Sequence, residues 1–149
     1  MKKTHWIIAG AIGSALAAAA AGGAAWAHHA FAAEFDGKAP VLLRGKVTRV
    51  EWINPHAWVH VAVPGANGQV TNWMVEGGTP NTLLRAGIDR NSLKAGTEII
   101  VRGYQSKDKL CRPACKANGR DVTFPDGRKL FMGSSGTGAP RDGSDPTER

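Results

Sequence analysis

The stretch that decides the fold is VLLRGKVTRVEWINPHAWVHVAV, residues 41–63. It holds two runs rich in β-branched residues, 41–52 and 57–63, in which apolar and polar residues tend to alternate. Such alternation over a short run is typical of a β-strand with one face in a core. Asn54-Pro55 lies between the runs and marks a turn. The stretch therefore predicts two neighbouring strands of a sheet.

Further strands and one helix are predicted toward the C-terminus. The strands are expected at 70–76, 97–104, 120–124 and 129–132, with the last two forming a hairpin. A short helix is expected between the third and fourth strands, with Thr79 as N-cap, Pro80 in the first turn and Gly87 after its end. The long polar segment 105–118 is interpreted as a loop.

The order of these elements predicts the fold class. Three strands, one helix and two or three further strands fit a mainly β protein, a small five- to six-stranded OB-like barrel with one short helix between strands three and four. Gly45 and Gly77-Gly78 would supply the bends that barrel closure needs. An open β-sandwich is the alternative.

The N-terminal segment has the features of a secretion signal. Lys2 and Lys3 precede an apolar run, and Ala25-Trp26-Ala27 fits the small-x-small rule for signal peptidase. We expect cleavage after Ala27 or after Ala25 and export to the periplasm or beyond, with an uncleaved membrane anchor as the alternative. The predicted organisation is a signal peptide, an N-terminal arm, a barrel domain and a disordered tail, at 1–27, 28–40, 41–132 and 133–149.

The composition excludes several classes of function. A chain of 149 residues is too short for a large multidomain enzyme. Cleavage after Ala27 would remove Lys2 and Lys3 and lower the net charge from +7 to +5. This charge is too small to indicate nucleic-acid binding, but it allows contact with an anionic membrane surface. The sequence contains no Gly-x-Ser-x-Gly, His-Glu-x-x-His or phosphate-loop motif, so we expect a binding protein and not an enzyme.

The N-terminal histidines are the first candidates for chemistry. Cleavage after Ala27 would make His28 the N-terminus, followed by His29, and would bring an α-amine and two imidazoles together. Cleavage after Ala25 would instead place His28 third in the mature chain. Both arrangements suit Cu(II), which prefers nitrogen donors in square-planar geometry. An inert, frayed terminus is the alternative.

His56 and His60 are the second candidates. Residues four apart on a strand are about 13 Å apart, which is too far for one metal ion. We expect His56, at the turn, to centre a ligand site at one mouth of the barrel, with Glu51, Asn54, His60 or Glu76 as further ligands or supports. The alternative is that Asn54 and His56 bond to the turn backbone and that His60 is structural.

Two other pairs of residues carry weaker signals. Cys111 and Cys115 are expected to form a disulfide in an oxidising compartment, and a thiolate pair for copper or zinc is the alternative. Trp52 and Trp58 could form a face that binds an envelope protein or a cell-wall ligand without any metal. If they do not, these rings fill the core or the mouth of the barrel.

Three segments resemble the DUF6152 family, small exported bacterial proteins of uncharacterised function. They are HHAFAAEFD at 28–36, GKVTRVEWINPHAW at 45–58 and GRDVTFPDGRKLF at 119–131. The resemblance implies an exported β-barrel domain and no known activity. It draws attention to His28, His29, Glu51, Asn54 and His56.

The leading hypothesis is a periplasmic β-barrel that binds a transition metal, copper in first place, through His28, His29 and His56. The alternative is the metal-free interaction module with the Trp52 and Trp58 face. A carrier of haem or another small molecule is a third hypothesis, but the chain has no haem-attachment motif.

Overall fold

The computed structural model describes residues 31–133. Its elements are β1 (Phe35–Glu51), β2 (Trp58–Pro64), β3 (Val70–Glu76), α2 (Pro80–Arg85), β4 (Glu98–Ser106), β5 (Cys115–Thr123) and β6 (Lys129–Phe131). The predicted signal peptide, His28, His29 and the predicted tail from residue 134 onward lie outside the described residues. Between residues 31 and 133, no helix is long and apolar enough to cross a bilayer.

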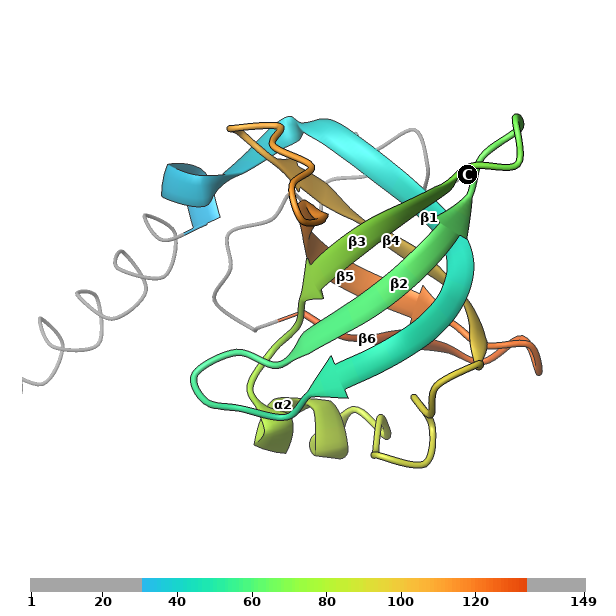
Figure 1. Cartoon of the computed structure of the whole chain (residues 1–149). Coiled ribbons are helices and arrows are strands. Elements are labelled where there is room, and N and C mark those ends of the chain that lie inside the picture. Colours follow the sequence, from blue (N-terminus) through green and yellow to red (C-terminus); the bar gives the residue numbers. More distant parts are fainter. Residues whose placement is uncertain (1–30, 134–149) are drawn as a thin grey trace, which may run out of the picture.

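The strands form a closed ring (Figure 1). Hydrogen-bonded neighbours follow the order β3-β2-β1-β4-β5-β6, and β3 also pairs with β5. The β3–β5 pairing is parallel, whereas the other pairings are antiparallel. The extra pairing joins β3, at one end of the sheet, to β5, the last strand but one, so five strands close into a ring and the short β6 extends beside β5. The prediction of an OB-like barrel is therefore confirmed.

The short helix also has the predicted limits. Thr79 Oγ1 accepts a hydrogen bond from the backbone amide of Thr82 at 3.1 Å, which caps the N-terminus of α2. Gly87 follows the helix with a φ of 84°, a conformation that glycine adopts without strain. Leu83 is fully buried, so α2 covers one end of the barrel with an apolar side chain (Figure 1).

Strand β1 is long because it takes part in both halves of the ring. Its first part pairs with β4 as far as Lys46, and its last part pairs with β2 from Lys46 onward. A Cβ atom at Gly45 would collide with the carbonyl oxygen of Ala62, so glycine permits the close approach of β1 and β2. A bulge between Val47 and Arg49 then shifts the register, which explains why apolar and polar residues alternate imperfectly in this stretch.

Two strand boundaries differ from the sequence prediction. β1 begins at Phe35, inside the predicted arm, because Phe35 pairs with Ser106 of β4. β5 begins at Cys115, inside the predicted loop, because its first four residues pair with β3 in parallel. Both extensions depend on partners far away in the sequence, so the local pattern does not indicate them.

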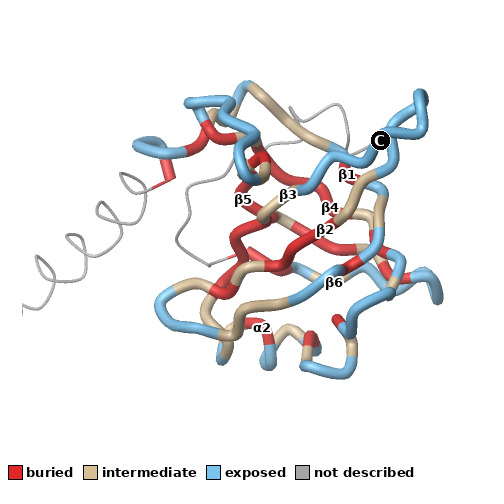
Figure 2. Tube along the Cα trace, in the orientation of Figure 1, coloured by how far each residue is buried: buried red, intermediate tan, exposed pale blue. Residues whose placement is uncertain are grey.

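The core fills the inside of the ring (Figure 2). Val59, Val61 and Val75 point inward and are almost completely buried, as the alternation along β2 and β3 predicts. A separate small cluster consists of Phe31, Phe35 and Tyr104. The rings of Phe31 and Tyr104 meet edge to face with their centroids 5.8 Å apart. This cluster attaches the beginning of the described chain to β4.

Candidate functional site

The candidate site lies on the outer face of the barrel, because alternate residues of each strand point away from the core. The strand registers place five residues in one row across five strands: Glu51, Trp58, Glu76, Asn118 and Tyr104. Glu76 is only 8% exposed and Asn118 only 1%. Polar side chains are seldom this buried without a specific set of partners.

His56 contacts the end of this row. It lies in the loop between β1 and β2, and its Nδ1 is 3.4 Å from Glu76 Oε1 and 3.3 Å from the carbonyl oxygen of Gly77. If Nδ1 carries the proton, it donates to the carbonyl oxygen of Gly77, and Nε2 then has a free lone pair. The side chain is 37% exposed, so part of the imidazole ring is open to solvent.

Glu76 is held in a poorly solvated position. Desolvation raises the pKa of the Glu76 carboxyl, and the charge of His56 partly opposes this effect. The carboxylate of Glu34 raises the pKa of Glu76 further, which indicates that residue 34 lies near the site. His56 is therefore paired with a buried carboxylate that lies close to the beginning of the described chain.

Asn118 completes this group from β5. Its Nδ2 donates to Glu76 Oε1 at 3.3 Å. Its Oδ1 is buried and has no hydrogen-bond partner among residues 31–133. A buried acceptor without a donor costs free energy, and it marks a position where a donor is missing. We call His56, Glu76 and Asn118 the seam site, because β3 and β5 meet there.

His60 has a different partner. Its Nε2 is 2.8 Å from Glu51 Oε1, and Arg49 Nη1 is 2.5 Å from the same oxygen. The hydrogen bond from His60 lowers the pKa of Glu51, although burial opposes this effect. His60 and Glu51 thus form a hydrogen-bonded polar pair. His56 in the loop and His60 in β2 therefore contact two different carboxylates, Glu76 and Glu51.

The remaining predicted residues have varied surroundings. Trp52 packs against the core, with the guanidinium of Arg90 5.3 Å from its ring centre. Trp58 belongs to the outer row, so these two rings do not form one exposed face. Asn54 is exposed, and its peptide bond to Pro55 is cis.

The disulfide between Cys111 and Cys115 is confirmed. It closes the segment that leads into β5, and Cys115 is itself the first residue of that strand. The two sulfur atoms are bonded to each other, so the alternative of a thiolate metal pair does not hold in this state of the protein.

The described part of the chain does not form a complete metal site. Between residues 31 and 133, no three His, Cys, Asp or Glu side chains are grouped so that they could hold a metal ion. His56 and Glu76 provide two donors, and the other predicted ligands, His28 and His29, lie outside the described residues.

Asn118 was missed by the sequence analysis. Asn118-Gly119 is a typical turn dipeptide, yet both residues lie in the middle of β5. Cys115 and Ala117, which alternate with polar residues and are buried, were the signal that could have indicated a strand here.

Comparison with known proteins identifies a family. The sequence model described as "Family of unknown function (DUF6152)" matches residues 15–112. The chain belongs to the DUF6152 family. The match includes His28, His29, His56 and Glu76, and it ends before β5 and Asn118. No curated protein and no solved structure matches the chain, so a function for this DUF6152 protein has to be argued from its own residues.

Proposed function

We propose that this DUF6152 protein is an exported binding protein, not an enzyme, which holds a transition-metal ion through His56, His28 and His29. Copper is the metal we propose first. The observation that carries the proposal is the contact between His56 and Glu76, because it leaves part of the imidazole ring open to solvent beside a poorly solvated carboxylate. A cation bound there would offset the cost of keeping that carboxylate out of water.

The anchoring of the N-terminal chain supports the proposal. Phe31 packs on Tyr104, which is the register partner of Asn118, and Asn118 is the partner of Glu76. Two strand spacings amount to about 10 Å. The proposal requires His28 and His29, which precede Phe31 closely in the sequence, to reach the seam site from this anchor.

The donor chemistry favours Cu(II). Imidazole nitrogens and an N-terminal amine are good ligands for this ion, and affinity for such sites is generally highest for copper among the divalent first-row metals. A site made from both the N-terminus and the barrel would also explain why residues 31–133 contain only one of the three proposed histidine ligands, His56.

The test is a titration of the cleaved protein with Cu(II), monitored by visible absorbance and EPR. We expect one equivalent to bind with nitrogen hyperfine structure in the EPR spectrum. The matched control is the same protein with an acetylated N-terminus, which keeps the barrel but blocks the amine, and it should bind copper more weakly. The absence of any spectral change up to one equivalent of copper would refute the proposal.

The second candidate is a metal-free interaction module of the cell envelope. Its support is Trp58, which is half-buried on the outer face between Glu51 and Glu76. Trp52 contributes less than predicted because it packs against the core. A Trp58→Ala variant that leaves copper binding unchanged but abolishes binding to isolated envelope fractions would favour this candidate.

A further inference from the structure

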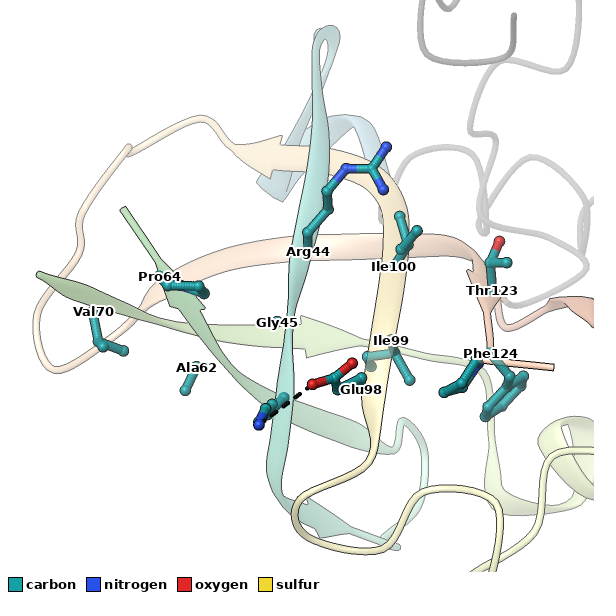
Figure 3. A pocket seen from close by; sticks show the side chains of 12 residues that line it. Arg44, Gly45, Ala62, Pro64, Val70, Glu98, Ile99, Ile100, Thr123 and Phe124 are labelled. Atoms are coloured by element: carbon teal, nitrogen blue, oxygen red, sulfur yellow. Dashed lines mark ion pairs between the residues drawn. The ribbon is translucent and has the colours of Figure 1, made fainter. Parts of the chain in front are cut away.

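A groove lies on the outer face of the barrel, away from the seam site. It has a volume of about 580 Å³ and crosses β1 and β4. Figure 3 shows Ala62, Pro64 and Val70 on one side of β1, with Thr123 and Phe124 on the other. None of the seam-site residues lines it. Its volume falls within the range of about 300–1,000 Å³ that is usual for small-molecule sites.

The lining of the groove is mostly apolar. The side chains of Ala62, Val70 and Ile100 supply aliphatic surface, and Phe124 supplies an aromatic ring. Val70 is 58% exposed, so its side chain is accessible to a molecule in the groove. Gly45 of β1 lies between the two walls.

The charges in the groove leave one net positive group. Lys46 Nζ lies 3.4 Å from Glu98 Oε1, so these two side chains compensate each other. Arg44 lies on the same face, and among residues 31–133 it has no acidic partner. In Figure 3 its guanidinium extends over β4 on the same side as Ile100. Guanidinium groups bind carboxylates and related oxyanions through charge-assisted hydrogen bonds.

We propose that this groove binds a small amphiphile with one acidic group, of which an alkyl carboxylate is the simplest example. The alkyl chain lies along Ile100 and Val70, and the carboxylate pairs with Arg44. Two facing walls suit a single chain of this kind. A flat lipid bilayer would instead require apolar side chains that project from the surface. The site uses no residue of the metal proposal, so a failure of one proposal does not affect the other.

The test is calorimetric titration of the cleaved protein with sodium decanoate below its critical micelle concentration, with EDTA present. We expect saturable binding of one molecule, weaker binding of decanol and no binding of decyltrimethylammonium. Arg44→Gln should weaken decanoate binding at least roughly tenfold, because it removes the charge-assisted hydrogen bonds to the carboxylate. The matched control is Arg112→Gln, which removes another exposed arginine outside the groove and should change nothing.

Val70→Asp tests the contribution of the apolar wall, as Arg44→Gln tests the contribution of the carboxylate headgroup. Val70→Asp puts a negative charge on an exposed wall position, so the barrel should fold normally, as thermal unfolding would show, and decanoate binding should be lost. If decanoate and decyltrimethylammonium bind equally well, the role of Arg44 is wrong. Binding of anionic vesicles without binding of monomeric decanoate would overturn the small-molecule proposal in favour of a membrane surface, and the absence of both would overturn it outright.

Discussion

Two histidine–carboxylate pairs lie on the same outer face of this barrel, and they differ in nearly every physical respect. His60 and Glu51 are 2.8 Å apart, and Arg49 shares the carboxylate. His56 and Glu76 are 3.4 Å apart, and beside them lies the buried amide of Asn118, whose oxygen has no partner in the described part of the chain. The pKa of Glu51 is lowered by its hydrogen bond from His60, whereas the pKa of Glu76 is raised by desolvation.

The difference separates a structural pair from a candidate site. The native partners of Glu51 stabilise its charged form, so this pair needs nothing else. Glu76 is ionisable but poorly solvated, and no donor within residues 31–133 reaches Oδ1 of the neighbouring Asn118. A ligand gains the most binding free energy where it supplies a partner that a polar group lacks in the folded protein.

Removal of each histidine tests this difference most strongly. We expect His56→Ala to weaken Cu(II) binding by about 100-fold, because even the loss of an indirect support costs 10–100-fold. His60→Ala, the matched control, should change copper affinity by less than about threefold, since its ring is engaged with Glu51. Competition titrations against a chelator of known affinity would measure both. Equal losses in the two variants would show that the pairs do not differ in function.

Side chains that support each pair should differ in their effect on stability. Asn118→Ala removes a fully buried amide and its hydrogen bond to Glu76, so we expect a loss of about 1–3 kcal/mol in the free energy of unfolding. Arg49→Ala removes one exposed partner of Glu51, and exposed ion pairs contribute less than about 1 kcal/mol. Urea denaturation of the metal-free protein measures both changes. A larger loss for Arg49→Ala would contradict the assignment of Asn118 to the more sensitive region.

The smallest expected effect concerns the two carboxylates, whose ionisation should change the stability of the folded protein in opposite directions. The pKa of Glu51 is lowered in the folded state, so its charge stabilises the protein above the ordinary value of 4.5, and this contribution disappears as pH falls through the lowered pKa. The pKa of Glu76 is raised, so ionisation destabilises the fold as pH rises above 4.5. At pH 7, Glu51→Gln should therefore destabilise the metal-free protein and Glu76→Gln should stabilise it, and both effects should fade in acid.

Thermal unfolding of both variants at pH 7 and at pH 3.5 tests this prediction. The two glutamines serve as controls for each other, because each replaces a glutamate on the same outer face by a neutral residue of the same size. Shifts of the same sign at pH 7 would show that the two carboxylates have similar environments.

Local sequence patterns predicted much of this architecture. The alternation in 57–63 and 70–76 identified β2 and β3, and the Thr79-Pro80 start and the Gly87 stop identified α2. These elements could be predicted because their signals lie within a few residues. The same patterns indicated Glu51 and Glu76 as neighbours of the two histidines, but not which carboxylate each histidine would contact.

The parts that could not be predicted depend on distant partners. The first residues of β5 look like a loop, since Asn118-Gly119 is a turn signal, and only the parallel pairing with β3 makes them a strand. The early start of β1 at Phe35 likewise depends on Ser106 of β4. The role of Asn118 could not be inferred because it arises from this pairing and from no local pattern.

The parallel contact between β3 and β5 also bears on how the protein reaches its folded state. Glu76 and Asn118 are 42 residues apart in the sequence, and contacts of this separation carry a large loop-closure entropy. Their contact exists only after the ring has closed. Any ion or molecule that binds across these two residues would select the closed form and stabilise it by mass action. Such a ligand would hold β3 and β5 together and so oppose reopening of the ring.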